Sequence, residues 1–473
     1  MGINNALYMG SNSLIAYGES VQVIGNNISN VNTLGFKGEN VKFGDVLSSN
    51  AARLQIGNGV QSVSVLQDQA KGSFQRSNNS TDMAIDGNGL FVLKNPTTGL
   101  SEYTRVGDFA LDKTQQLVAG NGSNVQGWQL DSLGNPIGSV VNVNVGGVIS
   151  VAQASSLLDV GVNLDNSVTA IDPAVTPFDP ANAATYHFKS DVQVLDSLGV
   201  LKDISVYYTK VGLDAGGNSV WDYHAMTDGA NVGGVAGVMT EIQNLGLPSA
   251  PAAIAANPTA STVAAGVVTT LGTQSLVFNN LGQLDTEIAP SLTIPWAGGA
   301  AVGTIQPNFG AAVTVDSSTG TAAVPNGVTG SGTDGAILAS SGFATRFSNR
   351  DGFPSGQLDR MEVDSKGKMF GIFTNGQRRP LYQVALASFP DESKLTKNGA
   401  SVMTESTTSG AAVIDKPGNS GLGVISSFSL ETSNVDLAGE FVNMIVVQRG
   451  YEANSKVVQT TDAMLQTLLG IKR

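Results

Sequence analysis

The clearest pattern in the chain is a repeat of apolar residues every seven positions within residues 1–34. One series consists of Leu7, Leu14, Val21 and Ile28, and a companion series offset by three or four residues consists of Ile3, Gly10, Tyr17, Ile24 and Val31. Paired series of this kind predict an α-helix with a heptad seam. The other positions are mostly Asn, Ser, Gln and Gly, which are modest helix formers, so this helix needs a partner.

A second helix is predicted over residues 434–473, where Ser433 or Asn434 would act as the N-cap and Asp436 would favour the helix dipole. Its apolar residues again recur every seven positions, at Leu437, Met444, Tyr451, Val458 and Leu465, and Phe441 widens the stripe. Two weak, seam-bearing helices that flank β-rich sequence predict a paired terminal module. We expect its seams to pack between subunits as well as within one chain.

The period of the pattern changes to two from about residue 73. Met83 and Ile85 precede the turn sequence Asp86–Gly89, and an apolar run follows, which predicts strand, turn and strand. The same pattern returns over residues 340–390, with turns at Asp364–Gly367 and Asn375-Gly376. We therefore predict one β domain made of residues 73–151 and 339–433. Residues 35–72 would connect it to the first helix, with a turn at Gly57-Asn58-Gly59 and a short strand over Val60–Leu66.

The interruption, residues 152–338, is predicted to be an inserted outer β domain, as one unit or two subdomains. Alternating residues on either side of Asp196–Gly199 predict a hairpin, and its core would be anchored by Tyr207, Tyr208, Trp221 and Tyr223. From about 225 to 340 the sequence is mostly Ala, Gly, Val, Thr and Ser, which predicts a shallow layer. The fold class is thus mainly β with paired N- and C-terminal α-helices: a nested, multi-domain filament subunit with a helical coiled-coil core.

Composition excludes most chemistry. The chain has 25 basic and 38 acidic residues, a net charge of −13, and no basic stripe, so we expect no nucleic-acid partner. It has no Cys and two His, His187 and His224, so no catalytic residue, metal site or cofactor is predicted, and a Ser-His-Asp triad would have to use one of the two. No apolar run could span a membrane, and the first residues do not form a cleavable signal peptide.

Several ordered motifs resemble one known family. They are Val23-Ile24-Gly25-Asn26-Asn27-Ile28-Ser29-Asn30 with Thr33–Lys37, Ala84–Phe91, Tyr103–Phe109, and Ser433–Leu437 with Glu440-Phe441, Met444-Ile445, Gln448-Arg449 and Tyr451–Asn454. Together these segments are similar to the signatures of bacterial flagellar rod and hook proteins. Val194–Gly199, Gly371–Pro380, Ala385–Phe389 and Pro417–Gly423 resemble the hook branch of that family.

The resemblance implies a structural subunit of a hollow, curved and flexible joint that transmits torque from rod to filament. It implies a helical homopolymer, type III export without a cleaved signal and an extracellular place in the flagellum. Its implied partners are the hook cap, the distal rod protein, the hook–filament junction protein and the export apparatus. Gly-rich borders near 145–147 and 330–342 are candidate hinges.

Three alternatives stay open at this point. A distal rod protein of the same family should lack so large an insertion. A secreted β-scaffold enzyme, such as a glycosidase, would need two carboxylates facing across a cleft; Asp285, Asp351 and Glu362 are available but stand in no motif. An adhesin or phage tail protein would share the β pattern but not the paired terminal signatures.

Overall fold

The computed structural model describes residues 2–46, 59–242, 260–264, 267–272, 274–313, 315–316 and 330–471. The fold is mainly β with two helices. The chain divides into two compact units, one of Met1–Val148 with Leu358–Arg473 and one of Ile149–Gln357. The predicted turn residues Gly57 and Asn58 lie outside the described residues. In the described part of the chain, neither helix has the length and hydropathy needed to cross a membrane.

The two helices are α1, Gly2–Ser29, and α2, Leu437–Ile471. Beyond α1 the backbone forms a turn in which the Thr33 N–H donates to the Asn30 carbonyl, and Gly35 adopts a left-handed φ of 63°. At the start of α2, Asp436 is the cap, because its Oδ1 accepts from the Ala438 N–H at 3.1 Å. The expected caps Ser433 and Asn434 precede that position, so this prediction was wrong.

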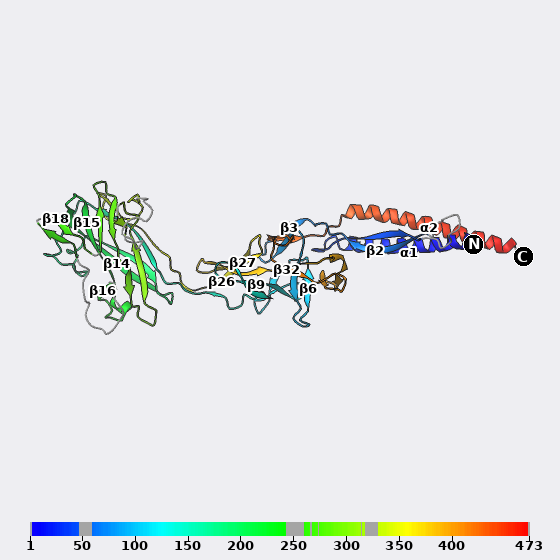
Figure 1. Ribbon diagram of the computed structural model, residues 1–473, viewed down its shortest axis with the longest axis horizontal. Helices are drawn as coiled ribbons and strands as arrows, with labels where there is room; N and C mark the ends of the chain where they lie inside the picture. Colours follow the sequence, from blue (N-terminus) through cyan, green and yellow to red (C-terminus); the bar gives the residue numbers. More distant parts are fainter. Residues whose placement is uncertain are drawn as a thin grey trace. The chain divides into compact units, whose positions relative to one another are not determined.

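The helices run antiparallel, and a two-stranded sheet lies against α1 (Figure 1). The sheet pairs β1, Glu39–Asp45, with β2, Val60–Gln67. The predicted strand at Val60–Leu66 is confirmed, whereas β1 was not predicted. The rings of Tyr17 on α1 and Phe43 on β1 lie 5.8 Å apart, so α1 is packed between α2 and this hairpin.

The main sheet of the first unit has the strand order β26-β27-β28-β9-β5-β6-β31-β30. The strands of this unit beyond β1 and β2 are β3 Phe74–Arg76, β4 Met83–Asp86, β5 Leu90–Lys94, β6 Ser101–Thr104, β7 Ala110–Leu111, β8 Leu117–Val118, β9 Asn124–Leu130, β10 Pro136–Asn142, β26 Gly356–Val363, β27 Lys368–Phe373, β28 Arg378–Val384, β29 Leu386–Ser388, β30 Thr396–Lys397, β31 Val402–Thr404, β32 Val413–Asp415, β33 Val424–Ser427 and β34 Ser429–Glu431. Strands from before and after the second unit share one core, which includes Phe91, Leu93, Met369 and Val384.

The segment around Asp86–Gly89 is not a hairpin, contrary to the prediction. Strand β4 pairs with β33, and β5 pairs with β6 and β9. The two apolar runs were assigned correctly as strands, but Gly87 and Gly89, at φ 133° and 115°, redirect the chain between two sheets. Alternation of apolar and polar residues indicates that a segment is a strand, but it does not show which other strand it pairs with. The predicted hairpins at Asp364–Gly367 and Asn375-Gly376 are confirmed.

One turn design recurs in both units, at Asp131, Asp196, Asp214, Asn279 and Asp364. In each, the side-chain Oδ1 accepts from the backbone N–H groups two and four residues later at 2.7–3.0 Å. The fourth residue is a Gly with φ between 70° and 84°. The turn at Asp112 follows the same plan but places Gln115, at φ 61°, in the left-handed position. A side chain there is strained, because its Cβ approaches the carbonyl oxygen.

The second unit is built on two further sheets, with orders β21-β22-β12-β24 and β17-β18-β14-β15-β19-β20-β23. Its strands are β11 Ile149–Ser150, β12 Leu157–Asp165, β13 Phe188–Leu195, β14 Leu201–Asp214, β15 Ser219–Asp228, β16 Met239–Glu241, β17 Thr262–Ala264, β18 Val267–Thr270, β19 Ser275–Phe278, β20 Leu284–Ile288, β21 Leu292–Ile294, β22 Gly303–Asn308, β23 Val315–Asp316, β24 Ile337–Ala339 and β25 Ala344–Arg350. The predicted β13–β14 hairpin is confirmed. Its expected anchors Tyr207, Tyr208, Trp221 and Tyr223 are all buried.

The region from 225 to 340 is not the shallow layer that its composition predicted. Its described strands complete the same core as β12–β15, with Leu276, Phe278, Ile294, Trp296 and Phe309 buried. A few large residues in the strands or just beyond their ends therefore supply the core of this region.

Candidate functional site

The interface between α1 and α2 is a stripe of small and polar residues. Among the residues of α1 whose side chains the structure describes, those that are buried are Gly10, Ser13, Ala16, Ser20, Ile24 and Asn27. A Cβ added at Gly10 would lie 2.6 Å from Val458 Cγ2, and one at Gly450 would lie 2.7 Å from the ring of Tyr17. The helices thus approach closely where one of them carries Gly.

Most residues of the predicted heptad seam on α1 flank this stripe. Leu7, Leu14, Tyr17, Val21 and Ile28 are half-buried, Ile24 is buried, and the side chain of Ile3 lies outside the described residues. On α2, Met444, Val458 and Leu465 are half-buried, and Val458 lies against Gly10 of α1. Three of the predicted residues, Leu437, Phe441 and Tyr451, are instead 40–49% exposed.

The outward side of α2 exposes large apolar residues, most of them in its first turns. Its exposed apolar residues are Leu437, Phe441, Val442, Ile445, Val446, Tyr451, Val457 and Met464. Five of them fall within Leu437–Val446, so the first turns of α2 expose apolar side chains on almost every side that does not face α1. An apolar surface of this extent on a helix marks a contact with another molecule.

A buried group of charges fixes both helices to the main sheet. Glu431, just before α2, accepts from Lys37 Nζ and from Arg105 Nε, each at 2.6 Å, and from the Gly72 N–H at 3.0 Å. The side chains of all three charged residues are at most 10% exposed. Burial by itself raises the pKa of Glu431, but the charge of Arg105 and the bonds from Lys37 and Gly72 outweigh it, so the pKa lies below its usual value.

Arg105 also organises the glycine turn of the 84–91 motif. Its guanidinium donates to the carbonyls of Gly89, at 2.5 Å, and of Ile85 and Gly87, both at 2.7 Å. A planar fork with five donors suits such a set of acceptors, and Lys would not replace it. The two motifs that were recognised separately in the sequence are therefore halves of one buried site.

Two asparagines of the terminal motifs join the helices to the hairpin. Asn27 on α1 bonds both backbone groups of Glu39, at 2.8 and 2.9 Å, and donates to Glu440 on α2 at 3.1 Å. Asn434 accepts from the Gly38 N–H at 2.8 Å and donates to the carbonyls of Asp68 and Ala70. The sequence showed these residues inside motifs, but their roles depend on partners far away along the chain.

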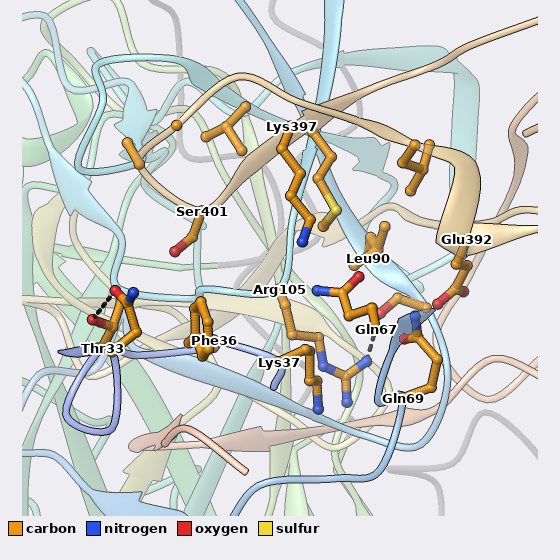
Figure 2. Close-up of a pocket in the computed structure, with 18 of the residues that line it drawn as sticks. Thr33, Phe36, Lys37, Gln67, Gln69, Leu90, Arg105, Glu392, Lys397 and Ser401 are labelled. Carbon is orange, nitrogen blue, oxygen red and sulfur yellow. Dashed lines mark hydrogen bonds between the residues drawn. The ribbon is translucent and has the colours of Figure 1, made fainter. Parts of the chain in front are cut away.

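A cavity of about 330 Å³ lies beside the buried charges (Figure 2). Phe36 and Lys37 line one side, Gln67 and Gln69 another, and Lys397 and Ser401 a third. Lys397 forms an ion pair with Glu39 of β1. Burial raises the pKa of Glu392, which also lines the cavity, and the charges of Arg105 and Lys37 offset this only in part.

Both histidines have structural contacts. His187 Nδ1 accepts from the Lys210 N–H and its Nε2 lies 3.0 Å from the Thr169 carbonyl, which assigns the hydrogen to Nε2. His224 lies 2.7 Å from Glu241 and stacks on Phe178. No group of three or more potential metal ligands occurs among the residues that the structure describes.

Three family descriptions match the chain. "Flagellar hook protein FlgE/F/G D1 domain" matches residues 84–170, "Flagellar basal body protein FlaE D2 domain" matches 163–353, and "Flagellar basal body rod FlgEFG protein C-terminal" matches 426–471. All three descriptions are of flagellar hook or basal-body proteins.

Relatives are similar along nearly the whole chain. The flagellar hook protein FlgE of Borreliella burgdorferi is 31% identical, with 99% of each chain covered. That of Escherichia coli K12 is 28% identical, over 97% of this chain and 98% of its own. A crystal structure of Helicobacter pylori flagellar hook protein FlgE2 covers 76% of this chain and all of its own, at 12% identity and a TM-score of 0.42, too distant a likeness to carry an argument. The chain belongs to the flagellar hook protein family.

Proposed function

We propose that the chain is the structural subunit of the bacterial flagellar hook and that it polymerises through the outward side of α2. The observation that carries the proposal is the exposed apolar surface over Leu437–Val446. In a subunit on its own this surface faces water, which is unfavourable for so much apolar area. A second copy of the chain would cover it.

In this proposal α1 and α2 form the coiled-coil core of the tube. The half-buried seam residues Leu7, Leu14, Tyr17, Val21 and Ile28 would contact neighbouring copies along the edges of the α1–α2 pair. Leu437, Phe441 and Tyr451 would do so from the outward side of α2. Met444, Val458 and Leu465 belong mainly to the intramolecular pair, as does Ile24.

The second unit would be the inserted outer domain of a nested subunit. Its two connections, near residues 149 and 357, support this plan because the core of the first unit uses strands from both sides of it. The wider proposal follows the family: a curved, torque-transmitting tube outside the cell, exported by the type III apparatus, that meets the hook cap, the distal rod protein and the hook–filament junction protein. It requires no catalytic residue and no cofactor.

The test is polymerisation of the purified chain under salting-out conditions, seeded with short hook fragments and followed by electron microscopy. Replacing Phe441 and Ile445 by Ser should prevent tube growth while circular dichroism shows an unchanged helix content. Leu133→Ser is the matched control, because Leu133 is 83% exposed at the tip of a β-turn. If the double variant formed tubes at the same protein concentration at which the Leu133→Ser control forms them, the proposal would be contradicted.

A further inference from the structure

In the described part of the chain, three ionic contacts join the helix–hairpin module, defined as residues 2–46, 59–71 and 434–471, to the rest of the first unit. One is the buried Lys37–Glu431–Arg105 group. The second is the pair between Glu39 of β1 and Lys397 of β30. The third is the pair of Lys71 and Asp86, 2.7 Å apart, in which both side chains are about half exposed.

These contacts differ in how far they are screened by solvent. The Glu431 side chain is 1% exposed, whereas that of Lys397 is 48% exposed and that of Glu39 is 18% exposed. Exposed pairs contribute little and weaken with salt, while removing one partner of a buried group leaves a charge without compensation. The buried group therefore stays closed under conditions in which the Glu39–Lys397 pair opens and closes.

The surroundings of the Glu39–Lys397 pair leave room for movement. Lys397 points into the cavity of about 330 Å³ (Figure 2), and a second cavity of about 320 Å³ is lined by Thr33 and Leu34. A close-packed interior would resist movement of the Lys397 side chain and of the turn beside it. The two cavities next to the loop at residues 30–36 leave space for that movement.

The wall that these cavities share is strained. Gly399, Ala400 and Ser401 take successive left-handed φ values of 83°, 50° and 57°, and Ala400 and Ser401 line both cavities. Two adjacent residues with side chains in this region cost conformational energy that only the surrounding contacts hold in place. Loosening those contacts lets the turn relax, so strain favours the open form of the pair.

We propose that the Glu39–Lys397 pair is a salt-sensitive latch between the helix–hairpin module and the β30–β31 turn, with the buried Glu431 group as the permanent attachment. Opening the latch frees Lys397 and the strained turn while the module stays anchored. The role of the latch in the polymer rests on the proposed function: in the assembled tube, latches that open on one side would let the subunits there adjust to bending. In the single subunit the latch is independent of polymerisation.

The test is a charge-reversal cycle in the full chain, read by hydrogen exchange of the monomer. Glu39→Lys and Lys397→Glu should each raise amide exchange several-fold in residues 396–404, and the double reversal should restore slow exchange. Added salt should speed exchange in the unaltered chain and not in either single variant. The matched control reverses the exposed Lys189–Asp191 pair, 2.9 Å apart on β13, and should leave residues 396–404 unchanged.

Equal exchange in the unaltered chain and both single variants would overturn the latch, as would a double reversal that fails to restore slow exchange. If a reversal unfolds the first unit, Glu39→Gln and Lys397→Met remove the attraction without repulsion and must still speed exchange locally. Polymerisation is scored separately by electron microscopy. If tubes grow normally but the exchange rates do not follow the predicted pattern, only the latch is disproved. If the exchange rates follow the pattern but the unaltered chain forms no tubes, the result counts against the proposed function and not against the latch.

Discussion

The two helices differ in what surrounds them. Helix α1 is enclosed by α2 on one side and by the β1–β2 hairpin on another, and Tyr8 and Ile15 are its exposed large apolar residues among those described. Helix α2 contacts α1 along one side and exposes eight large apolar residues elsewhere. In the proposed polymer, α2 would therefore supply more of the apolar contact area between subunits than α1 does.

This difference explains why the weaker heptad pattern belongs to the helix with the larger exposed apolar surface. Apolar side chains that extend around more than one side of a helix give a broader and less regular pattern than a single apolar stripe does. On α2 the irregularity is the informative feature.

The largest expected effect on polymerisation comes from placing one charge on each helix. Val446→Glu on α2 should raise the critical concentration for polymerisation by about tenfold or more. Burying a carboxylate against apolar neighbours makes the free energy of subunit addition less favourable by at least about 1.4 kcal/mol. Ile15→Glu on α1 should raise it far less, although Ile15 and Val446 are similarly exposed, at 60% and 63%. Sedimentation of polymer against total concentration measures both, and equal effects would remove the distinction between the helices.

A second prediction concerns the attachment that the helices share. Glu431→Gln should lower the free energy of unfolding of the first unit by about 3 kcal/mol, because Lys37 and Arg105 then stay buried without a countercharge. Chemical denaturation followed by hydrogen exchange in that unit measures the loss. A loss below about 1 kcal/mol would show that the group behaves like a surface ion pair.

The same group predicts a pH dependence. The pKa of Glu431 in the folded chain lies below the usual value of 4.5, so its contribution is complete above that value and is lost as the pH falls through the folded pKa. Glu431→Gln should therefore flatten the decline in stability below about pH 4.5. An equally steep decline in the variant would assign acid sensitivity to other carboxyls.

A third prediction uses the same substitution at two sites on α1. Gly10→Ala should destabilise the helix pair by about 1 kcal/mol, because the new methyl would lie 2.6 Å from Val458 Cγ2. Gly18→Ala should stabilise the helix by up to about 1 kcal/mol, since no heavy atom lies within 4 Å of the new methyl. Thermal unfolding followed by the circular-dichroism signal of the helices should show melting temperatures that shift in opposite directions for the two variants. Shifts in the same direction would mean that the helices do not pack closely at Gly10.

The smallest effect is expected outside both helices, at the Asp112 turn. Gln115→Gly should stabilise the first unit by about 0.5 kcal/mol, because relief of the left-handed strain at φ 61° exceeds the extra conformational entropy that Gly loses on folding. Gly134→Gln in the equivalent turn should destabilise by a similar amount. Denaturant midpoints measure both, and an unchanged midpoint for Gln115→Gly would show that the strain is already relieved in the folded chain.

The sequence predicted local features well and distant contacts poorly. The hairpins at Asp196, Asp364 and Asn375 depend on residues a few positions apart, so their turn chemistry is visible in the sequence. The pairing of β4 with β33 and the Lys37–Arg105–Glu431 group depend on residues brought together by the whole fold. No local pattern in the sequence marks that group, because Lys37 and Arg105 approach Glu431 only in the folded chain.

The predicted seam on α1 illustrates a second limit. Leu7, Leu14 and Val21 drew attention because they are apolar, but the closest approach to α2 occurs at Gly10, and Ser13 and Ala16 lie on the same buried stripe. Hydrophobic periodicity identifies surfaces that avoid water and does not show which of them meets the partner within the chain. Small residues at helical spacing were the signal for the intramolecular contact.

The bond between Asn27 and Glu440 joins residues 413 positions apart. Contacts of such separation form late in folding, since the entropy of closing the intervening chain is recovered only when the segments between them have folded. The hairpins can close within microseconds, whereas α1 must wait for α2. Pairing of the helices is therefore a late step: until the C-terminal segment has folded against α1, the chain presents no finished α1–α2 surface on which a second copy could dock.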